Sequence, residues 1–489
     1  MSTSSTRLGT RGLRFALLSM VLPVSVAAQA IAPEEYAARR DSLAAHLGDG
    51  IVIAFGAPAP AGVERQAQLP AFRWLTGFLE PDAALVLVLR GGHARGTLLT
   101  QPRDPRRALY DGFPPDSATV SRATGLAARS IAALAPLVDS LAATGQTLFT
   151  LRDYAGNDYA ESDSLTRGVA FMRGFASRHP GLEVRDAHPT TDSLRARKSL
   201  AELALLRRAI DVTVAAQGEA MAAIRSGTWE YQLDALFGAA FRQTGGDGPA
   251  FGSIIGSGPN STQYHYEANN RQMRAGDVVV MDVGAGWGGY AADVTRTVPV
   301  SGRFTPEQRA IYQIVREAQR AAERVAGPGA SYQAWRDSAR AVVARGVARL
   351  GLTEGVEATF DPPWADQCRL EAVRCTQAFL YMAHGLGHGI GLEVHDPPHP
   401  WKDTGSFAPG EVFTIEPGVY VSTRLLDILP DTPRNRAMIT KVRAAVARYD
   451  NIGIRIEDDY LITPSGVEWL SRAPREPAEI ESAMAHRGH

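Results

Sequence analysis

The sequence predicts a two-domain protein of mixed helix and strand, in which a smaller α/β domain precedes a larger α+β domain. The 489 residues suggest two or three domains, at roughly 150 residues per domain. Short apolar runs rich in β-branched residues recur between longer stretches with helical spacing. Hydrophobic residues make up 45% of the chain and charged residues 21%, which is typical of a folded globular protein.

The N-terminal 30 residues have the features of a secretory signal peptide. Three arginines precede an apolar run over residues 15–28, and small residues provide a cleavage site at Ala28 or Ala30. A membrane-spanning helix needs ~20 apolar residues, so this run is too short to be one. We therefore expect a periplasmic or secreted protein with no stable membrane insertion after cleavage. Its mature chain would carry 48 basic against 52 acidic residues, a charge of −4.

Charge and cysteine content argue against several classes of protein. The full chain has 51 basic and 52 acidic residues, so there is no basic excess to neutralise phosphates, and we expect no nucleic-acid partner. Cys368 and Cys375 are too few for a disulfide scaffold or a multi-cysteine metal site. In an oxidising compartment these two cysteines could close a small loop, and we favour that disulfide.

Residues 31–190 are predicted to form the α/β accessory domain. An amphipathic helix begins this domain at residues 33–46, and residues 117–143 have helical spacing. The apolar runs at 51–56 and 84–89 are bounded by turn residues and predict buried strands.

Residues 191–482 are predicted to form the larger domain. A helix is expected over residues 192–225, and another is expected to follow the N-cap Thr305 and to run to about residue 325. Two strands joined by a glycine turn predict an antiparallel hairpin, and two further strands follow; these four strands are expected at residues 278–285, 290–300, 411–417 and 452–463.

Four carboxylates interrupt these apolar strands: Asp282, Asp293, Glu416 and Glu457. A buried carboxylate is costly unless it is paired or bound to a metal. Each one alone could cap a turn or form an ion pair, but four acids gathered in a core would repel one another. One or two divalent cations would remove that repulsion.

Three of the eleven histidines lie within twelve residues: His384, His388 and His395. The spacing of the first two resembles a helical metal pair, but the glycines between them disfavour a helix. We interpret these glycines as a loop whose backbone passes close to a ligand. The cluster therefore predicts a functional site.

Four stretches of sequence resemble aminopeptidase P and prolidase, metallopeptidases of the pita-bread fold. They are MDVGAGWGGYAADVTRTVPVSGRFTPEQRAIY, HGLGHGIGLEVHD, FTIEPGVY and GIRIEDDYLIT. A shorter likeness, FRWLTGFLEPDAALVLV, covers part of the first domain. The resemblance implies a pita-bread (creatinase/aminopeptidase-like) catalytic domain over residues 191–482, preceded by a creatinase-type N-terminal domain.

The resemblance also implies a site of two divalent metal ions. Its ligands would be Asp282, Asp293, His388, Glu416 and Glu457. The same resemblance implies catalytic or substrate-binding roles for His265, His384, His395, Glu416 and Arg455. Softness rules favour Mn²⁺ at such an oxygen-rich site, with Co²⁺ or Zn²⁺ possible. A hydroxide bridging the metals would be the nucleophile, and Arg455 is expected to orient Glu457 by hydrogen bonding.

The implied activity is that of an exported Xaa-Pro aminopeptidase, acting on peptides with proline at the second position. An Xaa-Pro dipeptidase (prolidase) is the alternative, because Gly389 stands where aminopeptidase P often has Trp. A creatinase-like or non-catalytic member should lack ligands, whereas all five positions are filled here. Family members often form dimers or tetramers, so a homo-oligomer is expected.

An apparent insertion, residues 353–377, precedes the histidine cluster and contains both cysteines. It is either a surface loop or a lid over the site pinned by the disulfide.

Overall fold

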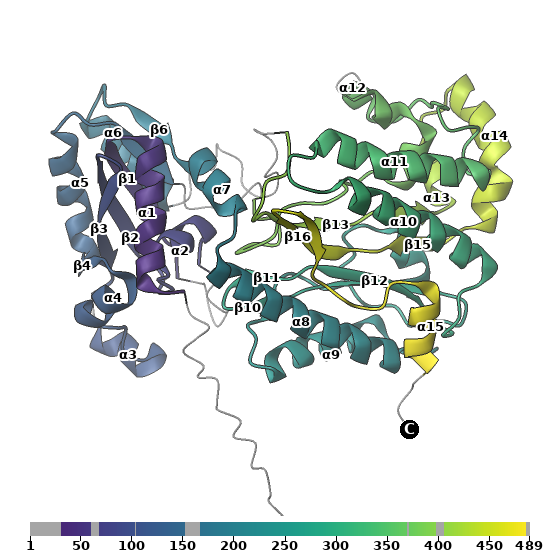
Figure 1. The fold of residues 1–489 in the computed structure, drawn as a ribbon, viewed down its shortest axis with the longest axis horizontal. Coiled ribbons are helices and arrows are strands. Elements are labelled where there is room, and N and C mark those ends of the chain that lie inside the picture. Colours follow the sequence, from purple (N-terminus) through teal and green to yellow (C-terminus); the bar gives the residue numbers. More distant parts are fainter. Residues whose placement is uncertain are drawn as a thin grey trace, which may run out of the picture.

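The computed structural model describes residues 31–59, 68–102, 104–151, 167–368, 371–397 and 405–485. Two domains lie side by side, and α7 (His188–Ala196) lies between them (Figure 1). The expected domain boundary after residue 190 falls within α7. The predicted signal peptide lies outside the described residues.

The N-terminal domain contains one mixed sheet with helices on both faces. Its strands run in the order β4-β3-β2-β1-β5-β6, with β1 antiparallel to β2 and parallel to β5. The strands are β1 (Gly50–Phe55), β2 (Ala84–Arg90), β3 (His93–Thr100), β4 (Ala127–Ser130), β5 (Leu148–Leu151) and β6 (Val184–Asp186). The helices before α7 are α1 (Pro33–Leu47), α2 (Pro70–Thr76), α3 (Pro105–Asp111), α4 (Ser117–Thr124), the 3₁₀ turn η2 (Ile131–Ala133), α5 (Leu134–Ala142) and α6 (Arg167–Arg178).

Strand β1 is apolar throughout because both of its faces are buried. Successive side chains of a strand point to opposite faces. Val52 packs in the core shared with α1 and α2, whereas Ile51 and Ile53 pack in the core shared with α5 and α6. Both faces are covered, so the apolar residues do not alternate with polar ones.

The helical spacing over residues 117–143 does not produce one helix. Helix α4 ends at Gly125, which has a left-handed φ of 67° that favours glycine. The chain then adds β4 to the edge of the sheet beside β3 before α5 begins. The expected continuous helix is therefore wrong, because pairing with β3 prevails over the local pattern.

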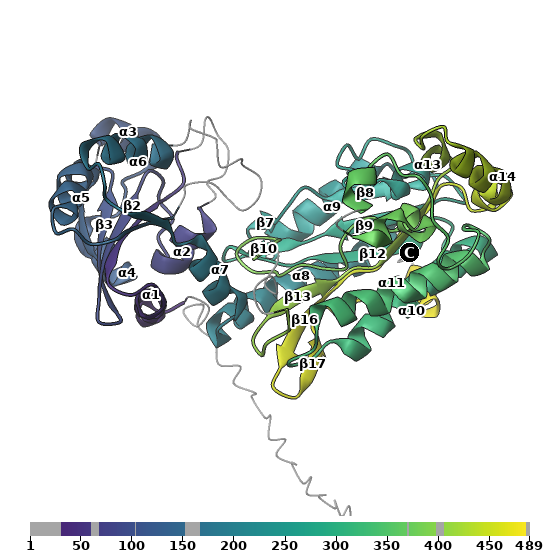
Figure 2. The same ribbon diagram turned by 90° about the horizontal axis from the view of Figure 1, so that it is seen from above.

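The C-terminal domain is layered. Its small sheets lie between the helix pair α8 and α9 and the helix pair α10 and α11, as both ribbon views show (Figures 1 and 2). The helices are α8 (Leu200–Ala223), α9 (Glu230–Gln243), η3 (Gly258–Thr262), α10 (Pro306–Val325), α11 (Tyr332–Arg349), α12 (Ala365–Cys368), η4 (Ala372–Cys375), η5 (Gln377–Tyr381), α13 (Arg424–Asp427), α14 (Pro433–Arg448) and α15 (Pro477–Ala485). The strands are β7 (Gly248–Pro249), β8 (Ile254–Ser257), β9 (Val278–Val283), β10 (Ala285–Trp287), β11 (Tyr290–Ala291), β12 (Val294–Pro299), β13 (Val412–Ile415), β14 (Gly418–Val421), β15 (Ile452–Arg455), β16 (Asp458–Thr463) and β17 (Gly466–Trp469).

The expected hairpin is present, with β9 antiparallel to β12 and Asp282 opposite Thr295. The hairpin breaks at Gly284, beyond which β10 and β11 join β7 in another sheet. A Cβ at Gly284 would lie 1.7 Å from the carbonyl oxygen of Ala292, so only glycine allows the two strands to approach this closely. Gln217 of α8 fixes the same region by donating to the carbonyls of Met281 and Val294, at 3.1 and 2.9 Å.

Two other predicted elements are present, one as expected and one divided into two strands. Helix α10 begins after Thr305, whose side chain forms a capping box with Gln308. The predicted strand over residues 452–463 is divided into β15 and β16, which pair with different partners, β14 and β13. Glu457 lies in the gap between them.

The segment 353–377 contains the expected Cys368–Cys375 disulfide. Its contacts reach α11, through the ion pair of Arg336 with Glu371, and α14, where Asn435 bonds the backbone of Asp361. Its function as a lid stays a prediction, which the kinetics of a Cys368→Ser variant would check.

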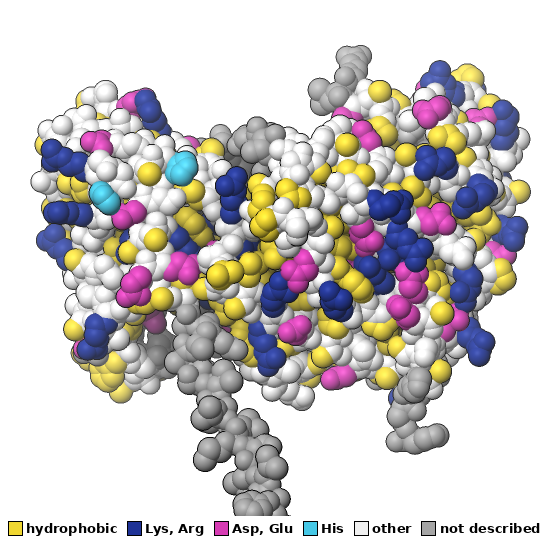
Figure 3. Space-filling model, viewed as in Figure 1, with side chains coloured by type: hydrophobic (Ala, Val, Ile, Leu, Met, Phe, Trp, Pro, Cys, Tyr) yellow, Lys and Arg dark blue, Asp and Glu magenta, His cyan; other side chains and the backbone are white. Residues whose placement is uncertain are grey.

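Acidic and basic side chains are mixed across the face of the C-terminal domain seen in Figure 3. Among the described residues, no helix combines the length and apolar character needed to cross a membrane.

Candidate metal centre and active site

Asp282 and Asp293 approach one another because of the broken hairpin. Asp282 lies on β9, and Asp293 lies in the short gap between β11 and β12 rather than within a strand. Both side chains are buried. One oxygen of each, Oδ1, has no hydrogen-bond partner within the described part of the chain. Buried oxygens of this kind are expected of metal ligands seen without their ion.

The histidine loop brings His388 to the same place. The Thr414 amide donates to the carbonyl of His388 at 2.9 Å, and the Glu416 amide donates to the carbonyl of Leu386 at 2.9 Å. The loop thus runs beside β13. His388 Nδ1 donates to the carbonyl of Gly389 at 3.0 Å, which leaves Nε2 available as a ligand atom.

The ligand atoms converge around this Nε2. It lies 3.6 Å from Asp293 Oδ2, 3.7 Å from Glu416 Oε1 and 3.8 Å from Glu457 Oε1. Ligand atoms of Asp293, His388 and Glu457 all lie within 4.8 Å of one another. Residues from three distant parts of the domain therefore meet in one buried cluster.

The carboxyl groups of this cluster hold their protons unusually strongly. Burial, followed by the charge of Asp282, raises the pKa of Glu457 to about 8. Burial and then the charge of Glu457 raise the pKa values of Asp293 and Glu416 well above their ordinary range. A divalent cation would reverse this effect by replacing the protons. The donor set therefore fits hard divalent cations.

Other side chains hold the ligands in place. Thr295 donates its hydroxyl proton to Glu457 Oε2 at 2.7 Å, and the amide of Asp293 donates to Asp459 Oδ2 at 3.2 Å. Sequence reasoning missed Thr295 and Asp459. Asp459 has the signal that revealed the other acids, an ionisable residue within an apolar strand, whereas Thr295 has none.

Arg455 contacts a different carboxylate from the one expected. Its guanidinium donates to Asp282 Oδ2 and, at 3.1 Å, to the hydroxyl of Tyr420. The expectation that Arg455 would hydrogen-bond to Glu457 is therefore wrong. β15 ends at Arg455 and β16 begins at Asp458, so Arg455 and Glu457 are not neighbours on one regular strand.

His384 belongs to a chain of hydrogen bonds from this arginine. The hydroxyl of Tyr420 donates to His384 Nε2 at 3.0 Å, and His384 Nδ1 donates to the carbonyl of Gly385 at 2.7 Å. Burial, followed by the charge of Arg455, lowers the pKa of His384 to about 3, so the ring is neutral. Its Nδ1 also lies 3.6 Å from Glu416 Oε2.

Tyr264 and Tyr420 are further residues that sequence reasoning missed. The rings of Tyr264 and Tyr420 lie 4.6 Å apart, and that of Tyr264 lies 5.2 Å from His384. The amide of Ala383 donates to the Tyr264 hydroxyl at 3.3 Å. The aromatic cluster therefore supports the histidine loop from a segment more than a hundred residues away.

The remaining expected residues surround this cluster. The ring of His395 lies 4.1 Å from that of His388, and its side chain is exposed. His265 is also exposed, and its charge is one of the smaller influences that lower the pKa of His384.

The linker between the domains also holds the histidine loop. Arg195 of α7 forms ion pairs with Asp396, at 2.5 Å, and with Glu393, at 3.0 Å. Lys198 donates to the carbonyls of Arg195 and Asp396 at 2.6 and 3.0 Å. Asp396 directly follows His395, so residues at the domain junction fix the end of this loop.

Two glycines of the loop, Gly387 and Gly389, let it lie close to neighbouring backbone. A Cβ at Gly387 would lie 2.0 Å from the carbonyl oxygen of Thr414, and one at Gly389 would lie 2.5 Å from that of Pro397. That the backbone at Gly385 and Gly387 also passes close to a ligand stays a prediction.

Taken together, four carboxylates and one imidazole on a layered α+β domain form a candidate metal-binding site. Comparisons with known proteins agree. Metallopeptidase family M24 matches residues 204–464, more than half of the chain, and the N-terminal domain of aminopeptidase P matches residues 36–149. The chain therefore belongs to metallopeptidase family M24, a family of hydrolases, which confirms the resemblance and the expected fold.

Individual relatives span nearly the whole chain. Xaa-Pro aminopeptidase of Escherichia coli is 32% identical over 481 residues, covering 93% of this chain and 98% of that protein. Xaa-Pro aminopeptidase of Haemophilus influenzae is 30% identical and covers 84% of this chain and 87% of that protein. The solved structure of Pseudomonas aeruginosa aminopeptidase PepP has a TM-score of 0.76 and 30% identity, covering 94% of this chain and 99% of that one.

Gly387 provides a test of the loop geometry. We expect Gly387→Ala to displace His388 and to lower both bound metal and peptidase activity, the latter by about tenfold or more because ligand placement is strict. Gly385→Ala is the matched control, since its new Cβ would meet only the Gly387 amide nitrogen, at 3.9 Å. Metal content and activity are the measurements. Equal behaviour of the two variants would contradict the assignment.

The raised carboxyl pKa values predict how metal removal affects stability. In the metal-free folded protein Glu457 stays protonated up to about pH 8, compared with an ordinary value of 4.5. The contribution of Glu457 to the free energy of unfolding is therefore fully present below pH 4.5, and it is lost as the pH rises towards 8. We expect the melting temperatures of metal-saturated and chelated protein to diverge progressively from pH 5 to pH 8.

Thermal melts of both forms across this range check the prediction. The Glu457→Gln variant should flatten the pH dependence of the chelated form. A constant difference between the two forms at all pH values would contradict it.

Proposed function

We propose that this protein is an exported Xaa-Pro aminopeptidase that removes the N-terminal residue from peptides with proline at the second position. The observation that supports the proposal most is the convergence of Asp293, His388, Glu416 and Glu457, beside Asp282, in one buried cluster. The names of the relatives support the same substrate class.

The ligand residues would hold two divalent cations, for which this oxygen-rich set favours Mn²⁺ over Co²⁺ or Zn²⁺. Such ions polarise the scissile carbonyl and lower the pKa of a water molecule. Arg455 donates a hydrogen bond to Asp282 Oδ2 and so orients this carboxylate as a ligand. Glu416 is near enough to His384 to share a proton network with it, and the exposed His265 and His395 can contact a bound peptide.

Peptide length separates this proposal from the prolidase alternative. We expect the protein loaded with Mn²⁺ to cleave an Xaa-Pro-Xaa tripeptide at least tenfold more efficiently, as kcat/KM, than the corresponding Xaa-Pro dipeptide. Chelation should abolish both reactions, and Glu416→Gln should do the same. Cleavage of dipeptides alone would assign a prolidase, and no cleavage by the folded, metal-loaded protein would overturn both readings.

The order of charge, apolar run and small residues in the N-terminal 30 residues supports export. We expect the mature protein recovered from the periplasm or medium to begin just after Ala28 or Ala30. N-terminal sequencing checks this expectation, and an intact N-terminus on protein found only in the cytoplasm would refute it.

A further inference from the structure

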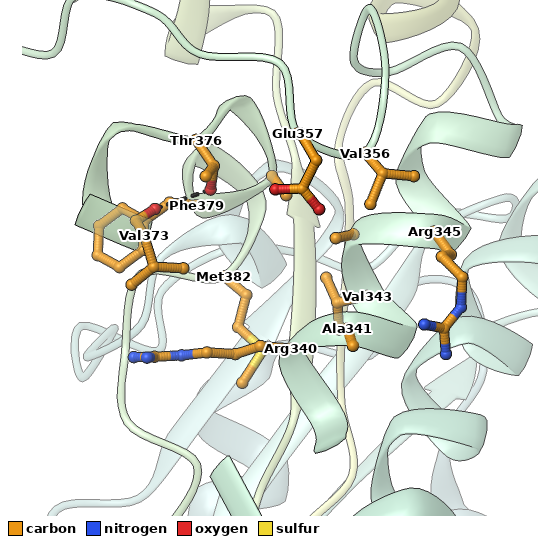
Figure 4. A pocket seen from close by; sticks show the side chains of 12 residues that line it. Arg340, Ala341, Val343, Arg345, Val356, Glu357, Val373, Thr376, Phe379 and Met382 are labelled. Atoms are coloured by element: carbon orange, nitrogen blue, oxygen red, sulfur yellow. Dashed lines mark hydrogen bonds between the residues drawn. The ribbon is translucent and has the colours of Figure 1, made fainter. Parts of the chain in front are cut away.

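A cavity lies between α11 and residues 356–382. Its volume is about 210 Å³, and apolar side chains form most of its wall, among them Val343, Val373, Phe379 and Met382 (Figure 4). None of the residues assigned above to the metal centre lines it. Cavities of this composition, with a few polar groups, are the usual form of small-ligand sites.

The charged residues that line this cavity are Arg340, Arg345 and Glu357, and the acidic residues nearby are engaged elsewhere. Glu371 is shared by Arg336, at 2.7 Å, and by Arg374, at 2.9 Å. The side chain of Asp337 is occupied by the amide of Gln333, at 2.8 Å. The guanidinium of Arg340, which lines the cavity, has no hydrogen bond or ion pair with any residue that the structure describes.

Arg340 is thus a partly buried cation that makes no ion pair with a described residue, although the charges of Glu371 and Asp337 attract it from beyond contact distance. Burial, and then the charge of Arg336, lowers its pKa. An unpaired guanidinium in an apolar wall is costly, and a carboxylate is its best geometric match because two parallel N–H groups can donate to its two oxygens.

The exposed residue Glu357 adds a second polar group. Its carboxylate points into the cavity on the side opposite Arg340 (Figure 4), and it makes no hydrogen bond to a described residue. A ligand with a carboxylate, an adjacent apolar group and an N–H donor would satisfy both charged residues. A fatty acid lacks the N–H donor, whereas the C-terminal residue of a peptide has all three groups.

We propose that this cavity binds the apolar C-terminal residue of a peptide, with the carboxylate on Arg340, the backbone N–H facing Glu357 and the side chain against Phe379 and Met382. The choice of a peptide as the ligand rests on the proposed function. The disulfide contributes by closing the ring of residues that carries Val373, one wall of the cavity.

The test uses N-acetyl-glycyl-leucine, which lacks a free amino terminus and so is no aminopeptidase substrate. We expect calorimetry on the metal-loaded protein to show binding, and the C-terminal amide of the same peptide to bind about tenfold more weakly, since one charge-assisted contact is lost. Arg340→Gln should weaken binding of the acid about tenfold. Arg345→Gln is the matched control, because Arg345 lies on the same helix at the exposed rim.

Two further measurements distinguish a loss of peptide binding from a loss of folding. Arg340→Gln should melt at the same temperature as the parent or higher, because it removes an unpaired cation, whereas loss of a structural arginine would lower it. Glu357→Gln should keep most of the affinity. Equal binding of acid and amide, preference for decanoate over the peptide, or no binding at millimolar peptide would each overturn the proposal. Because binding is measured without turnover, failure of Xaa-Pro hydrolysis would leave this result intact, and the reverse also holds.

Discussion

Repulsion among buried carboxylates is the constraint on which the catalytic domain depends. Asp293, Glu416 and Glu457 lie beside Asp282 in one cluster, where burial and mutual repulsion raise the pKa values of these three carboxyl groups. Folding alone gives no reason for this arrangement, since replacing such groups by apolar residues would be cheaper. A bound cation would make the cluster favourable, which would link metal binding to the stability of the surrounding strands.

The surrounding structure holds these groups together against their repulsion. Gly284 permits the close approach of the two hairpin arms, and Gly387 lets the histidine loop lie against β13. Gln217 donates to the backbone carbonyl of Met281, next to Asp282. Thr295 donates to the carboxylate of Glu457. These residues are not ligands themselves. They contribute by holding the ligand side chains in position.

Much of this site could be predicted from the sequence because its signals are local. A carboxylate inside an apolar strand is visible in a window of six residues, and Asp282 and Glu457 were found in this way. The contact of Arg455 with Asp282 and the contact of Tyr264 with the histidine loop could not be predicted in this way. Each joins residues that lie more than a hundred positions apart in the sequence. The same limit applies to residues 117–143, where pairing with β3 interrupts a locally helical pattern.

The ion pair of Arg195 with Asp396 makes the junction between the domains part of the catalytic loop. The C-terminal domain is consequently not a module that can be cut at the start of α8 and moved to another protein. A transplant that kept only the residues of the metal centre would leave Asp396 as a buried anion next to His395, with its counter-ion left behind on α7. Helix α7 therefore belongs with the catalytic domain, and a chimera that preserves this ion pair must be joined before α7.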